Sequence, residues 1–170
     1  MGALQAIHRE EPLHGQLGQI NDTLGDAMNS IRESVHDLHN ESLDLRQAMH
    51  ELCREFESEY HVGLHYDMTQ EIPRSVKYCF LAVIKEAFAN VVRHSDADKV
   101  SVFVCEHPGF YQMSVEDNGT TARLPDAAGP GEGGIGLANM TDRVQALGGS
   151  IHFRADNGFQ IMISIPKQKP

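Results

Sequence analysis

Three short segments of the chain carry polar groups whose types and spacing could do chemistry together. Glu86 and Asn90 stand four residues apart in a stretch that reads as a helix, and Asp117 ends a stretch that reads as a strand. A glycine-rich segment, Gly131 to Gly136, then leads into a second predicted helix. The three segments offer an acid with an amide, a carboxylate at a strand end, and free backbone amides at a helix start. Each is weak alone, but together they predict a site for ATP.

The first segment places its polar side chains along one edge of a helix. At about 100° per residue, Asn90 lies about 40° and His94 about 80° from Glu86. The Asn90 carbonyl is a hard oxygen that suits Mg²⁺, which takes its remaining ligands from water and phosphates. Glu86 could orient or deprotonate a water or an acceptor group, and Arg93 with His94 could add positive charge near phosphates. A polar edge that only faces water would have the same spacing.

The second segment is Asp117 with the Asn118-Gly119 that follows it. A carboxylate at a strand end can accept a hydrogen bond from the adenine amino group, whereas guanine presents an oxygen at that position. Loss of such a charge-assisted bond costs about 1.5–3 kcal/mol, or roughly ten- to a hundredfold in affinity. Gly119 would allow close approach of the base. An Asp-Asn-Gly turn that only joins two elements is the alternative.

The third segment contains Gly131, Gly133, Gly134 and Gly136 directly before a predicted helix. Free amides and the positive end of the helix dipole favour phosphate binding there. The spacing is similar to a dinucleotide fingerprint, but Asn139 stands where the third glycine belongs. The absence of Gly-Lys-Ser and Gly-Lys-Thr excludes a P-loop. A flexible linker would explain these glycines but would leave the other two segments unexplained.

Composition restricts the partners of the chain. Its 170 residues suffice for one domain, with or without an extension. The net charge of −10 argues against nucleic acid. The longest apolar run, Tyr78 to Ile84, is too short to span a bilayer, and the start of the chain lacks the pattern of a signal peptide. We therefore expect no membrane contact by this segment. The three widely spaced cysteines predict reduced thiols.

The periodicity of apolar residues predicts the elements. A narrow apolar seam from Leu17 to Phe56, with a break near residues 39–42, indicates a long partner helix. Further helices are predicted at 74–94 and 135–147, and strands at 62–68, 100–104, 111–115, 151–153 and 161–165. The last two strands form a hairpin around Asn157-Gly158, and residues 120–133 read as a loop. A mostly antiparallel sheet with helices on one face follows, which is an α+β fold.

In combination these segments resemble the GHKL ATPases, which include histidine kinases, type II topoisomerases, mismatch-repair ATPases and anti-sigma kinases. IKEAFANVVRHS, from Ile84 to Ser95, is similar to the N box of two-component sensor kinases of the nitrate-sensor type. GIGLANMTDR, from Gly134 to Arg143, is similar to their G2 segment. Gly148-Gly149-Ser150 and the closing strands are similar to their C-terminal hairpin. The resemblance covers Leu45 to Pro166.

The resemblance implies a Bergerat-type two-layer α/β sandwich, with a mixed, mostly antiparallel sheet, preceded by a long N-terminal helix. Residues 1–44 would then be part of a dimerisation helix and its linker, and residues 45–170 an ATP-binding catalytic domain. Mg-ATP would bind beneath a short lid from Thr121 to Gly133.

The resemblance also implies roles for single residues. Glu86 would be the polarising residue or general base, and Asn90 the Mg²⁺ ligand. Arg93 and His94 would lie near the phosphates, and Asp117 would read adenine. The other implied nucleotide-binding residues are Gly119, Gly131, Gly133, Gly134, Ile135, Gly136 and Leu137.

Two positions depart from the family pattern. Thr121 stands in place of a second glycine, which affects lid flexibility. Phe159 stands where a Thr is common, which removes one polar contact near the base.

The implied activity is transfer of the ATP γ-phosphoryl group to a histidine, for relay to the aspartate of a response regulator. His36-Asp37 has the local form of an acceptor but lies too near the ATP lobe, and His14-Gly15 lacks the acid. We therefore expect the acceptor to lie outside this chain. We also expect a homodimer through the N-terminal helix, and a cytoplasmic position as the C-terminal part of a larger sensor.

Two other classes of function remain open at this point. One is an anti-sigma-type Ser/Thr kinase or another GHKL ATPase, against which the helical seam from Leu17 argues. The other is a module that binds nucleotide, or a partner helix, without transferring phosphate. The joint presence of Glu86, Asn90 and Asp117 argues against that second class.

Overall fold

The computed structural model describes residues 43–69, 71–120 and 135–168. The part of the predicted N-terminal helix before residue 43, with His36, lies outside these residues, whereas its last part is described as a helix from Leu45 to Phe56. So do Thr121 and the rest of the predicted lid.

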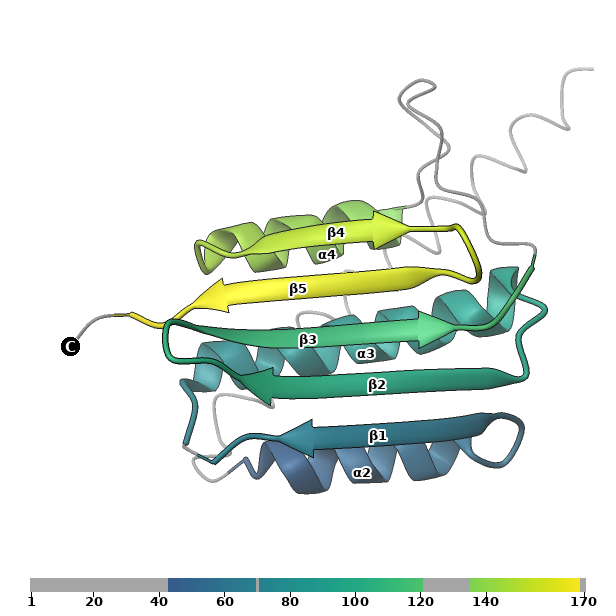
Figure 1. Cartoon of the computed structure of the whole chain (residues 1–170), viewed down its shortest axis with the longest axis horizontal. Coiled ribbons are helices and arrows are strands. Elements are labelled where there is room, and N and C mark those ends of the chain that lie inside the picture. Colours follow the sequence, from purple (N-terminus) through teal and green to yellow (C-terminus); the bar gives the residue numbers. More distant parts are fainter. Residues whose placement is uncertain (1–42, 70, 121–134, 169–170) are drawn as a thin grey trace, which may run out of the picture. The chain divides into compact units, whose positions relative to one another are not determined.

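A five-stranded mixed sheet forms one layer of the fold (Figure 1). The strands are β1 (His61–Asp67), β2 (Lys99–Glu106), β3 (Phe110–Asp117), β4 (Ser150–Arg154) and β5 (Gln160–Pro166). Their spatial order is β1-β2-β3-β5-β4. Only the β1–β2 pair is parallel, because a helical crossover separates these two strands, while the other three pairs are antiparallel. The predicted mixed, mostly antiparallel sheet is confirmed.

In the described part of the chain, three helices form the second layer: α2 (Leu45–Phe56), α3 (Arg74–His94) and α4 (Ile135–Ala146). All three cover the same face of the sheet (Figure 1). Helix α2 begins after Asp44, whose carboxylate accepts a hydrogen bond from the backbone N–H of Gln47 at 3.1 Å. Within the described ranges, no helix is both long enough and apolar enough to cross a bilayer.

The core lies between the two layers and follows the two-residue period of the strands. In β2 the residues Val100, Val102 and Val104 are buried, and their neighbours on the other face are more exposed. Phe80 and Ile84 of α3, both 0% exposed, pack onto this face from the helical layer. Burial of each such side chain stabilises the fold by about 1.5–3 kcal/mol.

The same alternation decides where the end of β3 points. Tyr111, Met113 and Val115 are buried on the helical face, and the next residue in this series is Asp117. Strand geometry therefore turns the Asp117 side chain toward the helices, where it is the only buried charged residue of the described part of the chain.

Candidate nucleotide-binding site

Helix α3 presents a polar edge beside its buried stripe. Glu86 and Asn90 are half-buried, and the apolar residues Val83, Ala87 and Val91 next to them are buried. The Asn90 side chain makes no hydrogen bond with any residue that the structure describes. Its amide oxygen is therefore available to a ligand. Arg93, which is exposed, follows on the same edge one turn later.

The start of α4 meets this edge of α3. A Cβ atom built at Gly136 would lie 2.0 Å from Oε1 of Glu86, a distance at which one of the two must move. Glycine at this position thus lets the helix backbone lie directly against the carboxylate. Ile135 is the first residue of α4, and Leu137 packs against the core. Gly131, Gly133 and Gly134 lie outside the described residues.

Among the described residues, Asp117 is held at the end of β3 through only one of its carboxylate oxygens. The side chain is 5% exposed. Oδ1 accepts hydrogen bonds from the Ser95 hydroxyl at 3.1 Å and from the backbone N–H of Gly119 at 2.7 Å. Oδ2 has no hydrogen-bond partner among the described residues. Since no side-chain polar atom there is both fully buried and without a partner, Oδ2 keeps access from outside.

The hairpin between β4 and β5 fixes the backbone of Asp117. Its N–H donates to the Phe159 carbonyl at 3.0 Å. Gly158 has a φ of 104°, and a Cβ atom there would lie 1.8 Å from the Asp117 carbonyl oxygen. Only glycine permits this approach. The contact from Phe159 comes from its backbone, so the side chain at that position is irrelevant to it.

The helix edge and the strand end lie on the same side of the sheet. Ser95, which hydrogen-bonds Asp117, directly follows the last residue of α3. The Asp117 carboxylate is thus anchored beside the end of the helix that carries Glu86 and Asn90. This placement is the one that binding of a single ligand by the helix edge and the strand end requires.

Residues 80–169 match a protein family described as "Histidine kinase-, DNA gyrase B-, and HSP90-like ATPase". The chain belongs to this family. It is 28% identical over 176 residues to the signal transduction histidine-protein kinase/phosphatase UhpB of Salmonella typhimurium. This alignment covers 98% of this chain and 34% of that protein. It is 31% identical over 139 residues to the sensor histidine kinase MctS of Rhizobium johnstonii, which covers 78% of this chain and 29% of that protein.

The fold is similar to that of a blue-light activated histidine kinase from Erythrobacter litoralis, with a TM-score of 0.66 at 20% identity. That likeness covers 89% of this chain and 51% of the other. The chain spans about a third of the length of the two curated relatives above. These findings confirm the predicted fold and the predicted ATP-binding domain of the GHKL ATPase family, with sensor histidine kinases among its relatives. The roles of single residues, Mg²⁺ and the domain division remain predictions.

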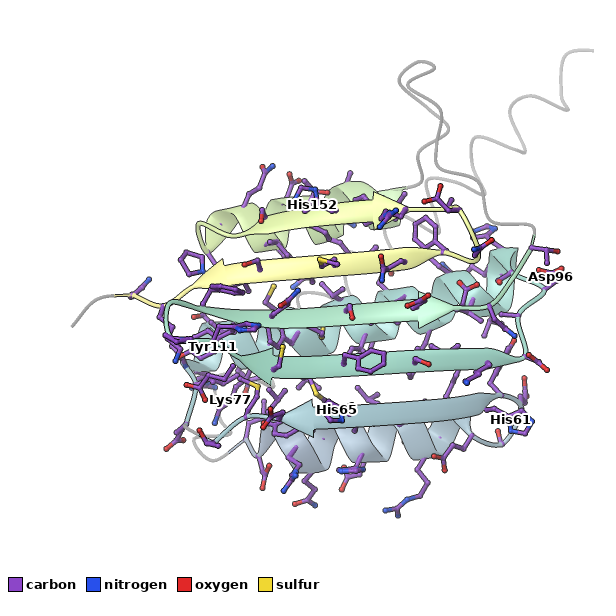
Figure 2. The ribbon with its side chains drawn as sticks, viewed as in Figure 1. His61, His65, Lys77, Asp96, Tyr111 and His152 are labelled. Atoms are coloured by element: carbon purple, nitrogen blue, oxygen red, sulfur yellow. The ribbon has the colours of Figure 1, made fainter. Side chains whose placement is uncertain are left out.

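The loop that follows α3 also supports the site, and its contacts were not predicted from the sequence. Ser95 bonds Asp117, and the Asp96 carboxylate accepts from both the N–H and the hydroxyl of Thr120 at 2.6 Å. Asp96 lies at the end of the sheet where β3 finishes (Figure 2). The signal was a run of small and acidic residues, Ser-Asp-Ala-Asp, directly after the helix.

Asn118 has a structural role in this arrangement. Its Oδ1 accepts from the backbone N–H groups of Asp98 and Lys99 at 3.1 and 3.0 Å, and its Nδ2 donates to the Asp98 carboxylate at 2.7 Å. The amide therefore ties the end of β3 to the start of β2. With its amide committed on both sides, Asn118 supports Asp117 and has little left to offer a ligand.

The described residues offer few ready-made ligands for a metal. They contain no group of three or more His, Cys, Asp or Glu side chains that could hold an ion. A magnesium ion at Asn90 would therefore depend on water and phosphates for most of its coordination, which is how Mg²⁺ commonly binds in phosphoryl-transfer sites.

Proposed function

We propose that this domain binds Mg-ATP between the polar edge of α3, the start of α4 and the end of β3. It would transfer the γ-phosphoryl group to a histidine of a dimerisation helix, for relay to the aspartate of a response regulator. The observation that carries the proposal is the buried Asp117 carboxylate, whose Oδ2 is left without a protein partner among the described residues. Because Oδ2 is accessible and the rest of the side chain is nearly buried, this oxygen is placed to accept a hydrogen bond from a ligand.

Asp117 would select the base. Its Oδ2 accepts a hydrogen bond from the amino group of adenine, and the guanine oxygen would be repelled by the same charge. Gly119 supports this role because its N–H donates to Oδ1 at 2.7 Å and so helps to fix the carboxylate.

The edge of α3 would serve the phosphates. The free amide oxygen of Asn90 would hold Mg²⁺, which neutralises charge on the phosphate oxygens when it is bound. Glu86, four residues earlier, would orient or accept the proton of the attacking group. Arg93 and His94 would place positive charge beside the phosphates.

Backbone amides would complete the phosphate site. Gly136 belongs to the first turn of α4, where the N–H groups lack intrahelical partners and the helix dipole favours an anion. The preceding segment would cover the nucleotide as a short lid. It contributes Gly131, Gly133 and Gly134, while Ile135 and Leu137 continue into the helix.

The rest of the assembly follows from the same proposal. Residues 1–44 would be part of the dimerisation helix and linker, and residues 45–170 the catalytic domain. The acceptor histidine would lie outside this chain, the whole protein would dimerise through the helix, and the domain would work in the cytoplasm. A response regulator would be the downstream partner.

Nucleotide binding tests the adenine assignment. Asp117→Asn replaces Oδ2 or its equivalent with a donor, so calorimetry should show ATP affinity weaker by roughly ten- to a hundredfold. Asp156→Asn is the matched control, because it removes the same charge from the exposed ion pair with Arg154 in the β4–β5 hairpin. It should leave the affinity unchanged. Unaltered ATP affinity in a folded Asp117→Asn variant would refute the assignment.

The chemistry of the transferred phosphate tests the reaction class. The whole protein incubated with γ-labelled ATP should acquire phosphate that is lost in acid and stable in base, as expected for phosphohistidine. Acid-stable label would indicate a Ser/Thr kinase instead. The 170-residue chain alone should bind ATP with little self-phosphorylation, and stoichiometric label on His36 would contradict the proposed position of the acceptor.

A further inference from the structure

Ser95 makes a short chain of hydrogen bonds that ends on Asp117. The residue is the C-cap of α3 and has extended backbone angles, φ −112° and ψ 148°. Its hydroxyl accepts from the backbone N–H of Ala97 at 3.2 Å and donates to Oδ1 of Asp117 at 3.1 Å. The hydrogen bonds of the Ser95 hydroxyl thus connect the end of α3 to the end of β3.

The direction of these bonds follows from counting protons. A serine hydroxyl has one proton and two lone pairs. An ionised carboxylate can only accept, so the single proton of Ser95 must point at Asp117. The Ala97 N–H can only donate, and it takes one lone pair of the same oxygen. The backbone of the α3–β2 loop thus orients the hydroxyl toward the carboxylate.

Gly119 makes room for this contact. A Cβ atom at Gly119 would lie 2.1 Å from the Ser95 hydroxyl oxygen and 2.9 Å from Oδ1 of Asp117. The space over the Gly119 Cα is therefore filled by Ser95, and the Gly119 N–H supplies the second bond to Oδ1. Both donors act on the same carboxylate oxygen.

We propose that Ser95 is a positioning residue for adenine selectivity. By occupying Oδ1 together with Gly119, it fixes the rotation of the carboxylate and reserves Oδ2 for the amino group of the base. The inference rests on the proposed function, in which Asp117 reads adenine. Ser95 itself need not touch the nucleotide.

A purely structural role for Ser95 makes a different prediction. If the hydroxyl only closed the end of α3 and the following turn, its loss would loosen the whole site and weaken all nucleotides alike. If it positions Asp117, its loss would weaken only nucleotides that carry the amino group. The ratio of two affinities separates these cases, whereas the affinity for ATP alone does not.

The experiment is calorimetry of the full chain with Mg²⁺ and either ATP or purine riboside triphosphate, in which hydrogen replaces the 6-amino group. The native chain should prefer ATP by about tenfold or more. Ser95→Ala should reduce this preference by about three- to tenfold and leave the affinity for purine riboside triphosphate unchanged. Ser95→Thr keeps the hydroxyl and should retain the preference.

Ser114→Ala is the matched control. Ser114 is in the middle of β3 on the face away from the helices, so removal of its hydroxyl should leave both affinities as they are. An unchanged preference in Ser95→Ala, or an equal loss for the two nucleotides, would overturn the inference.

Asp117→Asn separates this failure from failure of the proposed function. If Asp117→Asn abolishes the preference and Ser95→Ala does not, the positioning role is wrong and the adenine assignment stands. If Asp117→Asn keeps the native preference, the adenine assignment itself is wrong, and the role of Ser95 is wrong with it.

Discussion

Two carboxylates with little exposure lie at opposite ends of the central strands, and they differ in how many of their oxygens accept hydrogen bonds from the protein. Glu106, at the end of β2, has a side chain 9% exposed. Its Oε1 accepts from the Lys167 ammonium at 2.5 Å, and its Oε2 accepts from the N–H and hydroxyl of Thr69 at 3.3 and 3.4 Å. Asp117 lies at the end of β3, and its Oδ1 accepts two hydrogen bonds. Its Oδ2 accepts none from any described residue.

The difference separates a structural end of the sheet from a binding end. At the Glu106 end, marked by Tyr111 and Lys77 in Figure 2, the carboxylate has partners from two other segments, and Lys167 also lies over the Tyr111 ring at 5.2 Å. At the Asp117 end, no described residue bonds Oδ2 of Asp117 or the amide oxygen of Asn90. An accessible acceptor that no described residue satisfies adds nothing to the stability of the fold, so such groups indicate where a ligand is expected.

The largest expected effect comes from adding a methyl group behind Asp117. Gly158→Ala would place Cβ 1.8 Å from the Asp117 carbonyl oxygen at a φ of 104°, so the backbone of Asp117 would have to move. We expect a loss of about 3 kcal/mol or more in the free energy of unfolding, measured in urea. ATP affinity of the remaining folded protein should fall as well.

Gly148→Ala is the control at the other end of the sheet. Gly148 also has a positive φ, 69°, but the nearest atom to its added Cβ is the Pro166 Cγ at 3.8 Å, an ordinary contact. This variant carries only the backbone strain, about 1–2 kcal/mol, and should bind ATP normally. Equal effects of the two variants on ATP binding would contradict the division of the sheet into a structural end and a binding end.

Matched carboxamide substitutions give the next largest effect. Glu106→Gln removes the charge that pairs with Lys167 in a mostly buried setting, so we expect a loss of about 1–3 kcal/mol in unfolding free energy, with unchanged ATP affinity. Asp117→Asn keeps an oxygen for Ser95 and Gly119, so its loss of stability should stay below about 1 kcal/mol. The comparison fails if Glu106→Gln weakens ATP binding as much as Asp117→Asn does.

The layered architecture could be predicted because it depends on local periodicity. Alternation of Val100, Val102 and Val104 marks a strand in any context, and the Asn157-Gly158 pair marks a hairpin. The predicted bounds of β2 were short by one residue at its start and by two at its end, because β2 runs from Lys99 to Glu106 and both terminal residues are charged. The ends of a strand are set by its pairing with a neighbouring strand, such as the pairing of Lys99 with His61. The pattern of polar and apolar residues does not reveal this pairing.

The support of the site could not be predicted because it comes from residues far apart in sequence. Ser95 and Asp117 are 22 residues apart, and Glu106 and Lys167 are 61 apart. The local sequence around each of these residues does not indicate its partner, because the contact forms only when the strands pair in their native register. A hydrogen-bond acceptor at position 117 could be predicted, because the residue is an aspartate at the end of a predicted strand. Which of its oxygens remains open follows only from the folded geometry.

The last test uses the cysteines, of which the buried Cys53 and Cys79 report unfolding of the whole fold and Cys105 reports the Glu106 end. Burial raises the pKa of Cys53 and of Cys79 from 9.0 to about 11, and burial with the nearby Asp67 carboxylate raises the pKa of Cys105. The folded state thus favours the neutral thiol. This contribution to stability is complete below pH 9 and is lost as the pH rises toward 11. Unfolding free energy should fall across that window.

Reaction with a disulfide reagent at pH 8 should therefore modify the half-buried Cys105 first, and Cys53 and Cys79 only when the chain unfolds. Mg-ATP at a hundred times its dissociation constant should slow the two core thiols by about a hundredfold, because it binds only the folded state. Cys105 belongs to the Glu106 end, where it contacts His107, and its rate should not change. Equal protection of Cys105 would show that nucleotide binding at Asp117 is felt along the whole length of the sheet, and the division between the two ends would be wrong.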